Sequence, residues 1–135
     1  MEIKVSQKQG KVPITILHVV GDLTGEQILV QAARQAQEAG AHHILLDMTE
    51  VPYVSSSGLR GLHALWLMFR EDLSPEGDRV IKQGITSGSY KSSQVKLLKP
   101  SQNALKALSL SGYDMFLEIH HALDEAIDSF QPSEA

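Results

Sequence analysis

The sequence predicts an α/β fold, in which a mixed β-sheet of four to five strands packs with about four helices. Two apolar segments rich in β-branched residues come first, at residues 3–5 and 12–20, with Gly10 between them, and they indicate a hairpin. Helical and strand patterns then alternate along the rest of the chain. That order is typical of parallel strands joined by crossover helices, and at 135 residues we expect one domain over residues 1–135.

The composition of the chain narrows the classes of function. Hydrophobic residues make up 42% and charged residues 21%, which is ordinary for a soluble globular protein. No apolar run reaches the length of a membrane span and the first residues do not resemble a signal peptide, so we expect a cytoplasmic protein with no membrane partner. The lack of cysteine excludes disulfides, and a net charge of −4 provides no electrostatic footprint for nucleic acid.

The first helix is expected after the turn at Gly21 and Asp22. Thr24 followed three residues later by Gln27 matches a capping box, so we expect the helix to begin there. Gly40 is expected to end this helix. Between these limits apolar residues recur at helical spacing, namely Ile28, Leu29, Ala32, Ala33 and Ala36.

A buried strand and a second amphipathic helix are expected next. Residues 42–48 form a short, largely apolar run, which suits a strand covered on both faces. Asp47, near the end of that strand, is expected to hydrogen-bond to nearby loop amides. The segment from Ser55 to about Arg70 has large apolar residues at helical spacing, which we expect to face the core. These residues are Leu59, Leu62, Leu65, Trp66 and Phe69.

Residues 72–93 differ in character from the segments before them. They contain Pro75, several glycines and serines, and scattered charges. Long connections of this kind are uncommon in compact domains and are often functional. We therefore expect an insertion loop over residues 72–93, with a short helix or strand near residues 79–81.

Strand and helix patterns resume toward the end of the chain. Residues 95–98 indicate a strand, and Ser101 is expected to start a further helix that residues 111–113 end. Residues 115–117 are expected to form a short strand, because they are apolar and follow this break. The last helix is predicted over residues 120–130.

The segment most informative about function runs from Val54 to Gly58. It places three consecutive hydroxyls, on Ser55, Ser56 and Ser57, where the buried strand gives way to the second helix. A helix N-terminus leaves backbone N–H groups unpaired and carries partial positive charge, so the fold would tolerate a phosphate there. A serine that simply caps the helix is the alternative interpretation, because capping serines are common.

Four landmarks in the sequence resemble the STAS domain, the SpoIIAA-like fold of bacterial anti-sigma-factor antagonists. One precedes the first expected helix, one covers the central strand and its following loop, one opens the second helix, and one lies late in the chain. They are Gly21-Asp22-Leu23; Leu45-Leu46-Asp47-Met48 with Val51 and Val54; Ser56-Ser57-Gly58-Leu59; and Pro100-Ser101 with Leu105, Leu108 and Ser111-Gly112-Tyr113. Together these landmarks cover most of the chain.

The resemblance implies a non-enzymatic regulatory protein, an anti-sigma-factor antagonist without a cofactor. The implied partner is an anti-sigma factor that is a serine kinase of the histidine-kinase-like ATPase fold, with a serine phosphatase as an additional candidate. In the family, the kinase phosphorylates a hydroxyl at the start of the second helix, and the added charge weakens the complex. The matching residue here is Ser56, with Ser57 as the second candidate. The implied partner-binding residues are Asp22, Thr24, Val54, Ser55, Ser56, Ser57, Gly58 and Arg60.

Three residues depart from the pattern of the family. Ser55 stands where an acidic residue usually precedes the phosphorylated serine, Arg60 stands where a second glycine is common, and Thr24 replaces an acidic residue. The departures at Ser55 and Arg60, together with the insertion at residues 72–93, favour an alternative function, a constitutive scaffold or sensor subunit that phosphorylation does not control. Arg60 also lies one helical turn beyond Ser56, where it could pair with a phosphate on that serine.

Other chemistries find less support in the residues. The six histidines show no zinc-binding pattern, and the neighbours His42 and His43 diverge on the predicted strand, so no metal site is expected. A hydrolase would need Gly-x-Ser-x-Gly around its nucleophile, and Val54 stands where the first of these glycines is required. A small-ligand-binding domain is the remaining alternative, and it predicts an apolar pocket.

Overall fold

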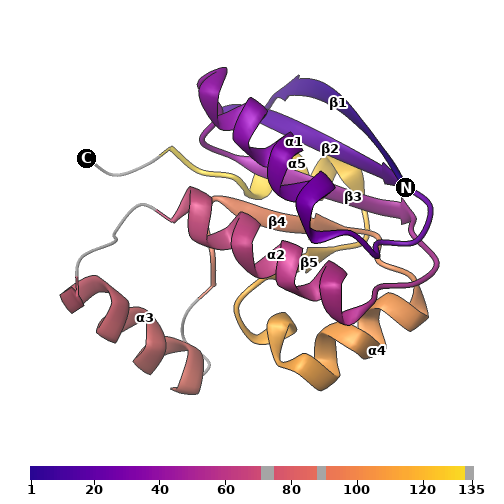
Figure 1. Ribbon diagram of the computed structural model, residues 1–135. Coiled ribbons are helices and arrows are strands. Elements are labelled where there is room, and N and C mark those ends of the chain that lie inside the picture. Colours follow the sequence, from indigo (N-terminus) through magenta and orange to yellow (C-terminus); the bar gives the residue numbers. More distant parts are fainter. Residues whose placement is uncertain (71–74, 88–90, 133–135) are drawn as a thin grey trace.

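Five strands form one mixed sheet in the computed structural model, which describes residues 1–70, 75–87 and 91–132 (Figure 1). The strands lie side by side in the order in which they occur along the chain. The first two form an antiparallel hairpin, and each later strand runs parallel to the one before it. They are β1 (Glu2–Gln9), β2 (Pro13–Val20), β3 (Ile44–Glu50), β4 (Val95–Leu98) and β5 (Glu118–His120).

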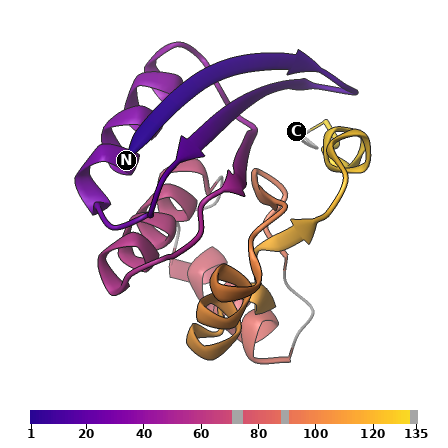
Figure 2. The ribbon, with the colours of Figure 1, turned by 90° about the vertical axis from the view of Figure 1, so that its right-hand side faces the viewer.

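In the described part of the chain, five α-helices accompany the sheet, one more than the sequence predicted. α1 and α2 lie together on one face of the sheet, whereas α5 lies on the other (Figure 2). Among the described residues, no helix has the length and apolar character that a membrane span requires. The helices are α1 (Glu26–Glu38), α2 (Ser56–Phe69), α3 (Pro75–Ser87), α4 (Gln102–Ser111) and α5 (Leu123–Ser129), and a 3-10 turn covers Tyr113–Met115.

The additional helix, α3, lies where the sequence predicted an insertion loop. It occupies thirteen residues of the segment 72–93, so most of this segment is helical. The short helix or strand predicted near residues 79–81 is therefore part of a longer helix. Ile81 is buried in the main core and Ile85, one turn further along, packs against that core. The spacing of these two residues is helical. The glycines around them nevertheless led to the prediction of a loop, since glycine disfavours a helix interior. Residues 72–74 and 88–90 lie outside the described residues.

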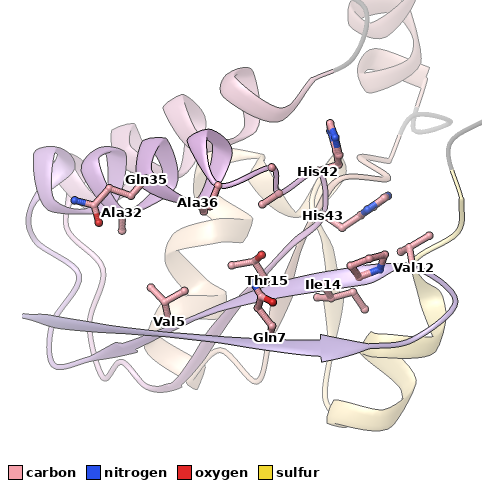
Figure 3. Close-up of a pocket in the computed structure, with 14 residues that line it drawn as sticks. Val5, Gln7, Val12, Ile14, Thr15, Ala32, Gln35, Ala36, His42 and His43 are labelled. Atoms are coloured by element: carbon pink, nitrogen blue, oxygen red, sulfur yellow. The ribbon is translucent and has the colours of Figure 1, made fainter.

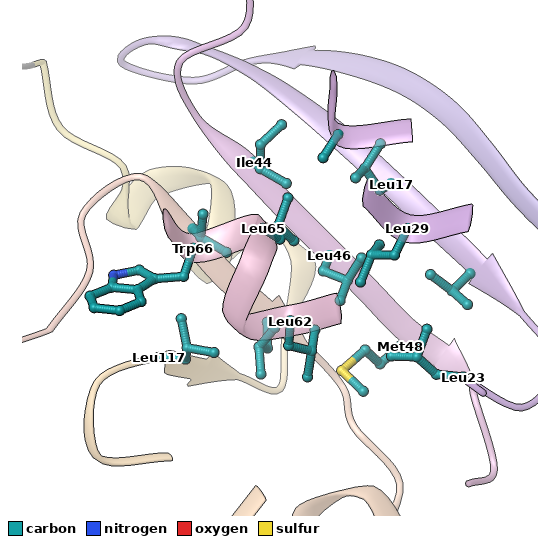
Figure 4. Close-up of a cluster of buried hydrophobic side chains, with 14 of the residues drawn as sticks. Leu17, Leu23, Leu29, Ile44, Leu46, Met48, Leu62, Leu65, Trp66 and Leu117 are labelled. Carbon is teal, nitrogen blue, oxygen red and sulfur yellow. The ribbon is translucent and has the colours of Figure 1, made fainter. Parts of the chain in front are cut away.

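Apolar side chains are buried on both faces of the sheet. On the larger face, Leu17 and Leu46 of neighbouring strands share one cluster with Leu29 of α1 and Leu65 of α2 (Figure 4). Trp66 belongs to this cluster as well, which confirms that the apolar stripe of α2 faces the core. The smaller cluster, on the face that α5 covers, consists of Val12, Ile14, Ile16, Leu45, Leu98, Ala126 and Phe130.

Several predicted boundaries are wrong, most of them near the end of the chain. The strand expected at residues 115–117 begins instead at Glu118, because Gly112 ends α4 with a φ of 80° and a 3-10 turn follows before the chain extends. His120 lies in β5, where it pairs with Leu98, so the last helix begins three residues later than predicted. β3 likewise begins and ends two residues later than the sequence pattern indicated.

The start of α2 packs directly on the backbone of the segment after β2. Leu23 forms an isolated parallel bridge with Val54, and its N–H donates to the carbonyl oxygen of Tyr53 at 2.9 Å. The carbonyl oxygen of Leu23 accepts a hydrogen bond from the N–H of Ser55 at 3.0 Å. A Cβ atom at Gly58 would lie 2.1 Å from that same oxygen, well inside van der Waals contact. The helix therefore requires glycine at this position.

A histidine between two carboxylates ties the ends of β2 and β3 together. In His18, Nδ1 lies 2.8 Å from Oδ2 of Asp47, and Nε2 lies 2.6 Å from Oε2 of Glu50. These hydrogen bonds raise the pKa of His18 above its ordinary value. Burial acts to raise the pKa of Asp47, but hydrogen bonds from Thr49 and then His18 outweigh it and lower that pKa. The amide of Thr49 donates to Asp47 at 3.0 Å, so Asp47 bonds to an amide within β3 and not to the loop amides that the sequence predicted.

Replacing Gly58 with alanine is expected to lower the free energy of unfolding by roughly 1–3 kcal/mol, because the added methyl group meets backbone that cannot move aside. Urea denaturation measures this change. Gly25→Ala is the matched control, since a Cβ atom there has no neighbour closer than 3.6 Å. We expect the control to change stability by about 0.5 kcal/mol or less. Equal destabilisation by the two substitutions would contradict the role assigned to Gly58.

Stability is expected to depend on the protonation of His18. Its raised pKa means that the folded state binds this proton more tightly than the unfolded state does. The contribution of protonated His18 to the free energy of unfolding is therefore complete below the ordinary pKa of about 6.5, and it is lost as the pH rises through the raised value. Between about pH 6 and about pH 9, the free energy of unfolding should fall more in the wild type than in His18→Gln. His121→Gln, at an exposed histidine, should behave like the wild type. Identical pH profiles for His18→Gln and the wild type would refute this linkage.

Candidate functional site

The start of α2 places its three consecutive serines in different environments. Ser55 is the N-cap residue, and its hydroxyl accepts a hydrogen bond from the N–H of Gly58 at 3.1 Å. The same hydroxyl donates to the carbonyl oxygen of Leu23 at 3.4 Å. Both hydrogen-bonding functions of this side chain are therefore in use. The capping role, which the sequence assigned to no particular serine, belongs to Ser55.

Ser56, by contrast, is exposed, and Ser57 is half-buried. Neither hydroxyl hydrogen-bonds to another residue that the structure describes. These serines are the first two residues of α2, where backbone N–H groups lack intrahelical acceptors and the helix dipole is positive. An anion attached to Ser56 would thus lie in solvent beside the helix end, and it would leave the cap intact.

Ser56 also lines a shallow depression between the start of α2 and helix α4. Tyr53 and Leu110 flank this depression as exposed apolar residues, with accessible fractions of 53% and 81%. The hydroxyl of Ser101, the N-cap residue of α4, donates to the carbonyl oxygen of Pro52 at 3.3 Å. This bond joins α4 to the loop that carries the serines, so one continuous surface includes residues from both helices.

The part of this surface that comes from α4 was not predicted from the sequence. The local pattern shows that α4 is amphipathic, but it does not show which earlier segment lies beside the helix. The available signal was Leu110, an apolar residue outside the buried stripe formed by Ala104 and Leu108. The residues of α4 that line the depression are Asn103, Lys106, Ala107, Leu110 and Ser111.

The remaining predicted site residues fall into an exposed and a buried group. Asp22 and Thr24 are exposed on the loop between β2 and α1. They lie next to the bridge that joins this loop to residues 54–58, the serine segment. Val54 is only 4% exposed and Gly58 is buried. The two buried residues therefore shape the site and offer little surface to another molecule.

The capping box predicted at Thr24 and Gln27 is wrong. The N-cap residue of α1 is Gly25, which has extended backbone geometry, and among the described residues no side chain caps this helix. Because Leu23 is held in its bridge, the backbone stays extended after it and the helix begins only at Glu26. Thr24 is left exposed on the surface beside the serine segment.

Arg60 extends toward α1 from the exposed side of α2. Its Nε atom lies 3.6 Å from Oε2 of Glu26, and the two side chains are 64% and 43% exposed. An ion pair this open to solvent contributes about 1 kcal/mol at most. Glu26, the first residue of α1, was not among the predicted site residues. The pair therefore holds Arg60 only weakly in this position.

Within the described ranges, no three histidine, aspartate or glutamate side chains converge as a metal site would require. His42 is exposed, whereas His43 is buried with its ring edge-on to that of Phe130, at 5.7 Å between ring centroids. The ring nitrogens of His18 contact carboxylates in different directions, which rules out a shared ion between them. The start of α2 thus presents an exposed hydroxyl beside a shallow, partly apolar depression.

The sequence of this chain matches the STAS domain family over residues 5–72, about half of its length. No curated protein has a sequence that matches it. One similar solved structure is an anti-sigma factor antagonist from Mycobacterium paratuberculosis, with a TM-score of 0.67 and 14% identity over 96% of this chain and 94% of that one. Another is a candidate anti-sigma factor antagonist from Thermotoga maritima, with a TM-score of 0.63 and 17% identity over 95% and 93%.

A third similar structure is the phosphorylated form of SpoIIAA, a Bacillus cell fate determinant. Its TM-score is 0.59 at 14% identity, and the similarity covers 94% of this chain and 97% of that one. Identities this low establish the fold alone, and they confirm the SpoIIAA-like arrangement predicted from the sequence. The family match extends from β1 to the residues just after α2, so it includes the serine segment. On this evidence the protein belongs to the STAS domain family.

Proposed function

We propose that this STAS domain is a non-enzymatic, cytoplasmic anti-sigma-factor antagonist that regulates transcription and is controlled by phosphorylation of Ser56. Its partner would be an anti-sigma factor that is also a serine kinase of the histidine-kinase-like ATPase fold, and a serine phosphatase would reverse the modification. One observation carries the proposal. Ser56 is exposed, and it has no hydrogen-bond partner among the described residues, whereas its neighbour Ser55 holds the helix cap.

The partner would dock over the exposed residues around Ser56. A specific interface usually buries about 1,600 Å² in total, which is more than a single loop provides. The depression between α2 and α4 extends the surface, and exposed aromatic and aliphatic side chains there would supply the apolar contacts that stabilise interfaces. The proposed contact residues are Asp22, Thr24, Tyr53, Ser56, Ser57, Arg60 and Leu110.

A phosphate on Ser56 would change this surface without unfolding the domain. It would add about −1.5 to −2 charges and three acceptor oxygens at the positive end of α2. A partner packed over the depression would have to desolvate that charge, which opposes binding. The phosphate carries more charge than the carboxylate of Glu26, so it would compete for Arg60. Regulation of this kind usually changes free energies by about 1–3 kcal/mol, or about 5–150-fold in affinity.

The similar structures support this proposal by analogy. Those from Mycobacterium paratuberculosis and Thermotoga maritima carry the name anti-sigma factor antagonist, and SpoIIAA is known in a phosphorylated form. Fold-level analogy does not transfer a partner or a phosphorylated residue to this chain. The argument for Ser56 depends instead on its exposure and on the separate role of Ser55.

Phosphate is expected on Ser56 when the protein is purified from its own cells and its phosphorylated residues are mapped by mass spectrometry. Ser56 presents the most accessible hydroxyl of the three serines, because Ser55 is bonded and Ser57 is half-buried. Ser56→Ala should abolish the modification, and Ser57→Ala should leave it in place. The assignment would be refuted by phosphate on Ser57 alone. It would also be refuted if the peptide that contains Ser56 carried no phosphate across growth and stress conditions.

Stability measurements should separate the capping serine from the exposed one. Ser55→Ala removes the acceptor for the N–H of Gly58 and should lower the free energy of unfolding by about 1 kcal/mol. Ser56→Ala removes a hydroxyl without a described partner and should change stability by about 0.5 kcal/mol or less. Urea denaturation of the two variants under identical conditions makes the comparison. A larger loss for Ser56→Ala than for Ser55→Ala would reverse the roles.

The alternative function is a constitutive scaffold or sensor subunit. Its specific support is that Ser55 and Arg60 replace residues usual in the family, and that both are engaged within the domain, Ser55 as the cap and Arg60 with Glu26. Such a subunit would assemble equally well as the wild type and as Ser56→Asp. The regulated antagonist would lose its partner in that variant, so one binding experiment distinguishes the two functions.

A further inference from the structure

A second candidate site lies at the opposite end of the sheet from Ser56. The serine segment follows the carboxyl end of β3, whereas a cavity of about 510 Å³ opens beside the first residues of β2. The β1–β2 hairpin forms one wall of this cavity, the C-terminal half of α1 forms the other, and the chain between α1 and β3 closes one end (Figure 3). Its volume is within the range of small-molecule sites, about 300–1,000 Å³.

The small side chains of α1 leave this cavity open. Ala32 and Ala36 face the hairpin, and neither fills the space between the helix and β1 (Figure 3). α1 packs instead against α2 over the central strands, so Val5 and Gln7 of β1 stay uncovered on this face. Val5 is 57% exposed as a result. The cavity therefore has apolar walls that no other described residue covers.

One polar group that lines the cavity has no partner within the described part of the chain. Thr15 is 6% exposed and lines the cavity, and its hydroxyl makes no hydrogen bond to a described residue. That hydroxyl is open to the cavity, so a molecule bound there can hydrogen-bond to it. The side-chain amides of Gln7 and Gln35 lie at the same cavity, and each contains a donor and an acceptor.

The charge of the lining restricts the ligand. Aspartate, glutamate, lysine and arginine are all missing from the lining, which the structure describes in full, and its two histidines, His42 and His43, lie at the end that the chain between α1 and β3 closes. An ionised group placed there would lose hydration without gaining an opposite charge, so a charged ligand is disfavoured. The polar groups on the hairpin wall, the hydroxyl of Thr15 and the amide of Gln7, match a head group that both donates and accepts hydrogen bonds.

We propose that this cavity binds an uncharged alkyl compound whose head group is an amide or an alcohol. The head group bonds to the hydroxyl of Thr15, with the amide of Gln7, its cross-strand neighbour, beside it. The alkyl chain lies along Val5 and the alanines of α1. This site is independent of the proposed phosphorylation of Ser56, because the two lie at opposite ends of the sheet and share no residue.

A titration of the full chain with octanamide at neutral pH tests the proposal. Binding is monitored by two-dimensional NMR, through the shifts of backbone amide resonances. The expected result is a saturable shift of the resonances of Gln7, Thr15 and Ala36. Thr15→Val, which keeps the shape and removes the hydroxyl, should weaken binding about five- to tenfold. Octanoate, which carries a charge on the same chain length, should bind more weakly than octanamide.

Two further variants keep the test decisive. Ala36→Leu fills the cavity and should abolish binding, whereas Ser6→Ala removes a hydroxyl from the opposite face of β1 and should leave binding unchanged. The proposal is overturned if octanamide shifts no resonance at the cavity, or shifts residues of α2 and α4 instead. Equal affinity for the wild type and folded Thr15→Val would overturn the assignment of the head group. None of these results depends on whether Ser56 is phosphorylated in cells.

Discussion

The close approach between Gly58 and the carbonyl oxygen of Leu23 is the constraint on which the site depends. That single backbone group accepts hydrogen bonds from the N–H and the hydroxyl of Ser55, and it lies where any side chain at position 58 would clash. The bridge between Leu23 and Val54 brings the two loops together in the first place. The position of Leu23 therefore determines the residue at which α2 begins, and with it the environment of each serine.

This arrangement divides two tasks between adjacent hydroxyls. Ser55 stabilises the helix end through its bond to the N–H of Gly58, and Ser56 is left on the surface. If one serine held both roles, adding charge to it would break the cap and destabilise the domain that the proposed partner would recognise. With the roles separated, the charge on the surface can change while the fold stays the same, as a reversible switch requires.

The sequence predicted what local chemistry decides and missed what tertiary contacts decide. Ser101 and Gly112 bound α4 as predicted, because a capping hydroxyl and a left-handed glycine act within one turn of the helix. Thr24 failed as a cap because a bridge to a distant loop held the preceding backbone extended. The helix at Pro75–Ser87 was missed because burial of Ile81 outweighs the low helix propensity of its glycines.

The two ends of the sheet differ in what covers them, and this difference separates the two proposed activities. At the carboxyl ends of β2 and β3, glycine at position 58 lets α2 approach the backbone, and the surface there is continuous and shallow. At the start of β2, alanines on α1 leave a gap above an edge strand, and a hollow results. Small residues thus have opposite effects at the two places. Where the opposing backbone can close in they produce tight packing, and where the opposing strand has no further neighbour they leave room for a ligand.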